Sequence, residues 1–229
     1  MRSSLLLGAM CLSVAVLVSC ASANGGGSGA SLSGNGTGTT EDASGAHPNL
    51  VAFVGRRLSV QHVEPEGGKL LFDAEFRVRV EVLHVVFGRY PSKEMEFSSY
   101  VHTGEPAFGQ HEFGMVYVSK YEGRLVQQKY LFQPVYPTSD GRFASCGDPY
   151  ERMPDVHRHG VRAQAITFKP SVTFDVRKED RRFRSFQDPF FRVENNVATC
   201  LMGNYPRELF QVMAEGYLRA RGVFERPSD

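Results

Sequence analysis

The chain contains the segment Ala74-Glu75-Phe76-Arg77-Val78-Arg79-Val80-Glu81-Val82, in which apolar and charged side chains alternate without a break. Successive side chains of a β-strand point to opposite faces, so a period of two predicts a strand with one buried and one solvated face. Gly88 and Pro91 follow as turn residues. We therefore expect a half-buried strand that starts near Leu70 and ends at Phe87.

Several further segments have strand composition and are separated by turn residues. The turn residues 65–68 precede the first strand described above, and residues 121–124 have the composition of a hairpin turn. The other expected strands are residues 51–63, 94–101, 113–121, 125–135, 161–168, 172–176 and 192–200. So many short strands predict a mainly β fold, a small barrel or sandwich of OB-like type.

The last element has the pattern of an α-helix. Asn204 is the expected N-cap, Pro206 suits the first turn, and Gly222 is the expected stop. One helical face is apolar and consists of Leu209, Val212, Met213 and Tyr217. We expect this C-terminal helix to pack on the barrel or sheet as a lid.

The strand pattern resembles that of the netrin-like or TIMP-like OB-fold domains. The resemblance covers residues 50–150 and is carried by residues 51–56, by residues 76–88, by residues 115–118 and by Cys146-Gly147. It implies an OB-fold layout. The metalloprotease inhibitors of that group use an N-terminal cysteine held against the barrel, whereas Cys20 is separated from the first strand by a linker. Their inhibitory mechanism is therefore not carried over.

The N-terminus has the features of an export signal. Arg2 precedes an apolar run of 14 residues, Leu5–Val18. A membrane-spanning helix needs about 20 residues, so this run predicts a cleaved signal instead. Leu17-Val18-Ser19-Cys20 resembles a bacterial lipobox, which implies lipidation of Cys20. Alternatively, residues 21–23 fit an ordinary signal peptidase site, and the product would then be soluble and secreted.

These features predict three regions. Residues 1–19 are the signal peptide, residues 20–48 are the lipidated cysteine with a Gly/Ser-rich tether, and residues 49–229 are a single β-rich domain in the periplasm. A flexible coil of residues 21–48 spans roughly 30 Å on average. Because no Asp follows Cys20, the resemblance to lipoproteins implies anchoring in the outer membrane, on its periplasmic face.

Charge and cysteine content restrict the possible partners. From residue 49 on, 25 basic residues (26 less Arg2) face 23 acidic ones (25 less Glu41 and Asp42), a net charge near +2. This balance argues against nucleic acid as a partner. In an oxidising compartment, the two cysteines of the domain, Cys146 and Cys200, predict a disulfide.

Two clusters of side chains are candidates for chemistry or binding. The chain lacks the common hydrolase and phosphate-binding motifs. On an extended segment, Asp155, His157 and His159 share one side and form a candidate zinc site, although a His-x-His pair in a polar loop is more often simply solvated. The arginines of residues 177–184 form a candidate partner-binding or lipid-phosphate-binding surface. Within them we single out Arg181, Arg182 and Arg184.

These observations lead to two expectations for function. The first is a lipid-anchored, non-catalytic module of the cell envelope that uses no cofactor and binds an envelope protein or component, as an inhibitor, immunity factor or assembly accessory. The second is a metal-dependent hydrolase of the cell envelope that uses Asp155, His157 and His159.

Overall fold

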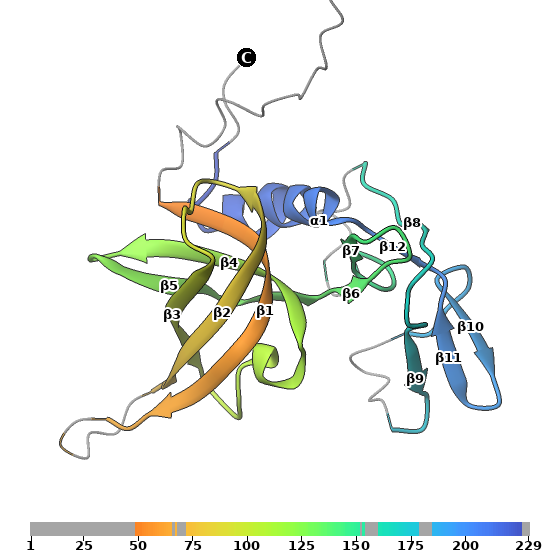
Figure 1. Ribbon diagram of the computed structural model, residues 1–229, viewed down its shortest axis with the longest axis horizontal. Coiled ribbons are helices and arrows are strands. Elements are labelled where there is room, and N and C mark those ends of the chain that lie inside the picture. Colours follow the sequence, from red (N-terminus) through yellow and green to blue (C-terminus); the bar gives the residue numbers. More distant parts are fainter. Residues whose placement is uncertain are drawn as a thin grey trace, which may run out of the picture. The chain divides into compact units, whose positions relative to one another are not determined.

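The computed structural model describes residues 49–65, 67, 72–151, 153, 160–178 and 185–225. Five strands form a closed barrel in the order β1-β2-β3-β5-β4 (Figure 1). They are β1 (Leu50–Val63), β2 (Ala74–Phe87), β3 (Glu94–Val101), β4 (Phe113–Tyr121) and β5 (Arg124–Pro134). Strands β3 and β5 are parallel, and the other neighbouring pairs are antiparallel. The mainly β fold of OB-like type with a C-terminal helix is thus confirmed.

The barrel interior is filled by the apolar residues of the alternating strands. The apolar side of the segment that predicted β2 contributes Phe76, Val78 and Val80, all of them buried. The opposite side carries Arg77 and Arg79, which are exposed. A short 3₁₀ helix, η2 (Ala107–Gln110), lies between β3 and β4 and adds the buried Phe108 to this core. Burial of one face per strand stabilises the closed sheet.

The C-terminal helix covers the outer wall of the barrel. Helix α1 (Pro206–Met213) continues as a π-helical segment, η4 (Ala214–Leu218). Leu209, Val212 and Met213 belong to a second apolar cluster that includes Ala52 and Tyr117. Residues 50–54 of β1 are therefore buried on both faces, one toward the barrel interior and one toward the helix.

The helix begins one residue later than the sequence indicated. Tyr205 is the N-cap, and Glu208 Oε2 accepts a hydrogen bond from the Tyr205 backbone N–H at 3.0 Å. Asn204 is fully buried, and its Nδ2 donates to Arg162 O at 2.9 Å and to Glu208 Oε2 at 3.1 Å. The Asn204 amide thus links the helix start to a preceding loop.

A second, three-stranded sheet has the order β10-β11-β9. Its strands are β9 (Thr173–Asp175), β10 (Phe191–Glu194) and β11 (Val197–Cys200). The prediction of one strand over 192–200 was wrong. Asn195 and Asn196 have positive φ values of 50° and 62° and form a two-residue hairpin turn, a conformation that asparagine tolerates.

The remaining strands are short two-residue pairs. Strand β6 (Tyr136–Pro137) pairs with β7 (Phe143–Ala144), and β8 (Gln164–Ala165) pairs with β12 (Met202–Gly203). The expected strand over 161–168 is therefore only two residues long. The predicted disulfide is confirmed: Cys146, which follows β7, is bonded to Cys200 of β11, with the two Cα atoms 6.0 Å apart.

Candidate functional site

Several residues singled out in the sequence lie outside the described part of the chain. They are Cys20, Asp155, His157, His159, Arg181, Arg182 and Arg184. Among the residues that the structure does describe, no three His, Cys, Asp or Glu side chains are grouped to hold a metal ion. Within the same residues, no helix has the length and apolar character needed to cross a membrane.

A bulge in β5 is the main irregularity of the barrel. Val116 of β4 pairs with Phe132 and Val118 pairs with Gln127, so two residue steps in β4 face five in β5. The three extra residues interrupt the pairing with β4, and β-bulges redirect the side chains that they carry. Tyr130, in this bulge, has a positive φ of 63°. For a bulky residue this left-handed conformation is strained.

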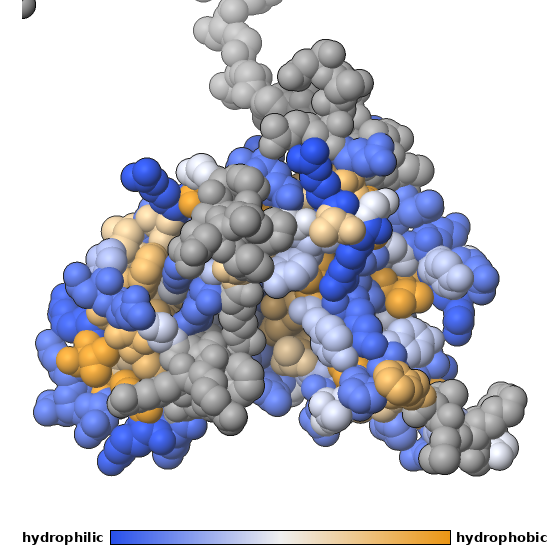
Figure 2. All heavy atoms as spheres, turned by 180° about the vertical axis from the view of Figure 1, so that it is seen from behind, coloured by the Kyte–Doolittle hydropathy of each residue, from blue (hydrophilic) through white to orange (hydrophobic). Residues whose placement is uncertain are grey.

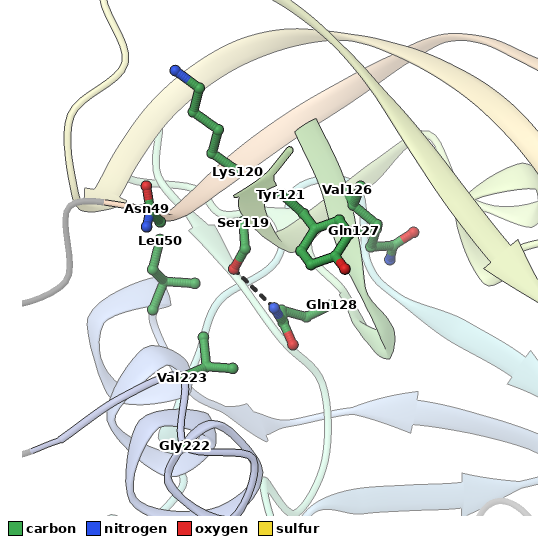
Figure 3. Close-up of a pocket in the computed structure, with 10 residues that line it drawn as sticks. All are labelled: Asn49, Leu50, Ser119, Lys120, Tyr121, Val126, Gln127, Gln128, Gly222 and Val223. Atoms are coloured by element: carbon green, nitrogen blue, oxygen red, sulfur yellow. Dashed lines mark hydrogen bonds between the residues drawn. The ribbon is translucent and has the colours of Figure 1, made fainter. Parts of the chain in front are cut away.

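Two neighbouring segments hold the bulge in place. From the C-terminal end, Arg221 Nη2 donates to Lys129 O at 2.9 Å and Nη1 donates to Gln128 Oε1 at 3.3 Å. From β4, Ser119 Oγ accepts from Gln128 Nε2 at 2.8 Å (Figure 3). Figure 3 also shows that Val223 lies beside this pair, in a hollow of about 450 Å³ on one side of the bulge.

Two aromatic side chains near the bulge are exposed. Phe72, just before β2, is 84 % exposed, and Tyr130 is 63 % exposed. His102, just after β3, joins them: its ring stacks on Phe72 with centroids 4.7 Å apart, and its backbone N–H donates to Tyr130 Oη at 3.3 Å. We call Phe72, His102 and Tyr130 the aromatic patch.

The polar contacts under the aromatic patch fix its geometry. His102 Nδ1 lies 2.9 Å from Phe72 O, and because a carbonyl oxygen only accepts, Nδ1 is the donor. Asp73 Oδ2 accepts from Lys129 Nζ at 2.6 Å. This hydrogen bond raises the pKa of Lys129 above its usual value. Asp73 Oδ1 lies 3.7 Å from His102 Nδ1, so the same carboxylate contacts both His102 and Lys129 of the bulge.

A groove of about 550 Å³ begins at Tyr130 and runs along β5. Its walls come from η2, from β5, from the segment after β7 that contains Cys146, and from α1 and η4. We call it the β5 groove. Its size lies in the range of small-ligand sites. The lining mixes apolar side chains with the amides of Gln110 and Gln133 and the carboxylates of Asp148 and Glu151.

The β5 groove also has an aromatic wall. Phe132 stacks on His111 with ring centroids 5.6 Å apart. The Phe132 ring occupies the space in which Gly114 would carry a side chain, because a Cβ there would lie 2.0 Å from Phe132 Cε2. Gln133 is held from below by the buried Tyr117, whose hydroxyl donates to Gln133 Oε1 at 2.6 Å. Burial raises the pKa of Tyr117, so it stays a neutral donor.

The outer face of β1, β2 and β3 carries charged side chains, unlike the aromatic patch. The outer side chains of β1, β2 and β3 form cross-strand ion pairs, Arg56 with Glu81 at 2.5 Å, Arg77 with Glu96 at 3.6 Å and Arg79 with Glu94 at 2.9 Å. These charges balance one another. In the view of Figure 2, hydrophilic side chains predominate and apolar ones form small separate patches.

Comparison with protein-family models, with curated proteins and with solved structures gave no match for this chain.

Sequence reasoning did not find the aromatic patch. The sequence pattern predicts Phe72 within a strand that starts near Leu70, and Tyr130 within an ordinary strand over 125–135. No local signal marks Tyr130, because neither glycine nor asparagine occupies the positive-φ position. No local signal marks His102 either, and in the structure it contacts both Phe72 and Tyr130.

Proposed function

We propose that this chain is a lipid-anchored, non-catalytic binding module of the cell envelope, and that its partner docks on the aromatic patch and the β5 groove. One observation carries the proposal: Tyr130 is held in a strained backbone conformation with its ring exposed to water. Strained residues with no stabilising burial of their own concentrate at functional sites. Exposed aromatic side chains are also the commonest anchors of binding interfaces.

The anchoring part of the proposal rests on the sequence. The lipobox residues Leu17–Cys20 and the tether over 21–48 would place the domain on the periplasmic face of the outer membrane, free to reach partners roughly 30 Å away on average. The predicted tether ends directly before β1, whose first residue is Leu50.

The proposal is tested with the full chain expressed in a bacterial envelope, cross-linked in place and captured with its bound components. Wild-type protein should enrich one dominant component, and Tyr130→Ala should lose most of it. Tyr121→Ala is the matched control because Tyr121, the last residue of β4, is 62 % exposed and does not line the β5 groove. Equal capture by wild type and Tyr130→Ala would refute docking at the patch.

The anchor is tested separately by fractionation. Cys20→Ser should remain unlipidated and leave the membrane fraction, whereas wild-type protein should carry a lipid-modified N-terminal cysteine in mass spectrometry. An unmodified wild-type N-terminus at Asn24 would refute the lipoprotein assignment.

A further inference from the structure

We infer that the β5 groove binds an extended segment of a partner protein, which adds as a β-strand to the unpaired edge of β5 and carries basic side chains. This inference rests on the proposed function and specifies the kind of partner. Three features of the described residues carry it: an edge of β5 without a neighbouring strand, a groove that leaves this edge open, and a carboxylate in the groove lining.

The first feature is the incomplete pairing of β5. Strand β3 pairs with β5 at Ser98 and Val126, before the bulge. After the bulge, residues 132–134 of β5 pair with β4 on one side. Among the described residues, no strand pairs with them on the other side. An unpaired strand edge is a template for a strand from another chain.

The register shows which backbone groups face this open edge. Val135 N donates to Phe113 O of β4 at 3.3 Å. Because the backbone groups of successive residues point to opposite sides of a strand, those of Gln133 also face β4, whereas those of Phe132 and Pro134 face away from it. Proline has no N–H, and within sheets it is found where that group would have no ladder partner. The open edge therefore presents the N–H of Phe132 and the C=O groups of Phe132 and Pro134 to an added strand.

The second feature is the β5 groove, which lies along this edge and has a volume of about 550 Å³. Tyr130, Phe132 and Pro134 belong to its lining, together with residues of η2 and of the segment after β7. Residues 132–134 are half-buried, so the edge borders a hollow that solvent reaches. Strand residues rise about 3.4 Å each, so residues 130–134 offer a strip about 17 Å long to an extended peptide.

The third feature is the charge of Glu151 in the groove lining. Its Oε1 accepts a hydrogen bond from the Ser185 backbone N–H. This donor positions the carboxylate and leaves its negative charge in place, because a backbone amide has no net charge. A lysine or arginine of the added strand would meet a complementary charge there. The groove therefore favours a basic segment over an acidic one.

The inference is tested with purified full chain in detergent by isothermal titration against an octapeptide of alternating valine and lysine, whose pattern suits a strand with one basic side. An octapeptide of alternating valine and glutamate is the acidic comparison. The lysine peptide should bind with a Kd below about 1 mM, and the glutamate peptide should bind more weakly. Glu151→Gln keeps the acceptor for Ser185 and should weaken binding of the lysine peptide about threefold at low salt. Glu194→Gln is the matched control and should bind like wild type, because Glu194 is exposed and does not line the groove.

Backbone pairing is tested in the same samples by amide hydrogen exchange measured by NMR. In the free protein, the Phe132 N–H should exchange faster than the Val135 N–H, which is bonded to β4. With saturating lysine peptide, exchange at Phe132 should slow by about tenfold or more, because the added strand accepts this hydrogen bond. Exchange at Val135 is the internal reference.

The outcomes separate strand addition from the proposed function. Strand addition is overturned if the lysine peptide does not bind at concentrations up to about 1 mM, if the glutamate peptide binds more tightly, or if binding leaves exchange at Phe132 unchanged. The proposed function still stands in those cases if Tyr130→Ala loses the component captured from the envelope. If Phe132 is protected and Tyr130→Ala captures like wild type, strand addition stands and docking at the aromatic patch fails.

Discussion

The disulfide between Cys146 and Cys200 should supply much of the net stability of this domain. The two cysteines are 54 residues apart in the sequence. In the chain-entropy model, the cross-link lowers the entropy of the unfolded chain by about 2.1 + 1.5R ln 54, or about 14 cal/mol/K. This corresponds to about 4 kcal/mol at 25 °C. Domains of this size are stable by only about 5–15 kcal/mol, so the loss would be large.

The native contacts around the bond should survive its removal. Two backbone hydrogen bonds join the same segments, from Ser145 N to Asn204 O and from Gly147 N to Met202 O, both at 2.9 Å. Replacement of both cysteines by alanine should therefore leave the far-UV circular dichroism spectrum unchanged. The double variant is less stable because its unfolded chain has a higher conformational entropy. This effect acts on the unfolded state and does not depend on the contacts of the folded state.

The assay is urea unfolding at 25 °C followed by circular dichroism, with wild type, the Cys146→Ala/Cys200→Ala double variant and reduced wild type. The double variant and the reduced protein should both lose about 4 kcal/mol relative to oxidised wild type. Agreement between them excludes a packing effect of the substitutions. A loss below about 1 kcal/mol in the reduced protein would refute the entropic argument.

Three further predictions concern packing, pH and metal. Gly203→Ala should destabilise the fold by about 1–3 kcal/mol in the same urea assay. The new Cβ would lie 1.8 Å from the backbone carbonyl oxygen of Ser145, which cannot move aside as a side chain could. An unchanged unfolding midpoint would contradict this prediction. Hydrogen bonds from Arg177 lower the pKa of Asp175 to about 2 in the folded protein, below its value in the unfolded chain. The ionised carboxylate therefore stabilises the fold above about pH 4, and this contribution is lost as the pH falls toward 2. Asp175→Asn should therefore flatten the decline of the melting temperature over that interval, and identical pH curves would count against the ion pair. Envelope binding should survive the combined change His157→Ala and His159→Ala; stoichiometric metal in the purified protein, with loss of function on chelation, would instead support the hydrolase alternative.

The strands of the barrel were predictable because their signal is local. Residues 94–101 and 113–121 are strands with the bounds that the alternation indicates. The disulfide followed from cysteine parity alone. The sequence pattern did not predict the hairpin at Asn195-Asn196 because the residues on both sides have strand composition. The two asparagines between them form the turn. The predicted N-cap, Asn204, was wrong because the buried Asn204 amide donates a hydrogen bond to Arg162 O, which is distant in the sequence, and does not cap the helix.

The candidate site was less accessible from the sequence. A period of two predicts on which face a side chain lies only while the register holds, and the β5 bulge breaks the register between Gln127 and Phe132. The bulge is held by Arg221, more than ninety positions away. Such contacts leave no pattern in either segment, so neither the exposure of Tyr130 nor its proximity to His102 could be inferred beforehand.

The sequence by itself determined the mainly β class, most barrel strands, the C-terminal helix and the disulfide, because each depends on periodicity or composition within a short segment or on cysteine count. The tertiary structure alone decided the closure of the barrel, the second core beneath α1, and the assembly of Phe72, His102 and Tyr130 from three separate segments. Those features depend on contacts between residues distant in the chain, and the free energy of such contacts is set by packing that no local pattern encodes.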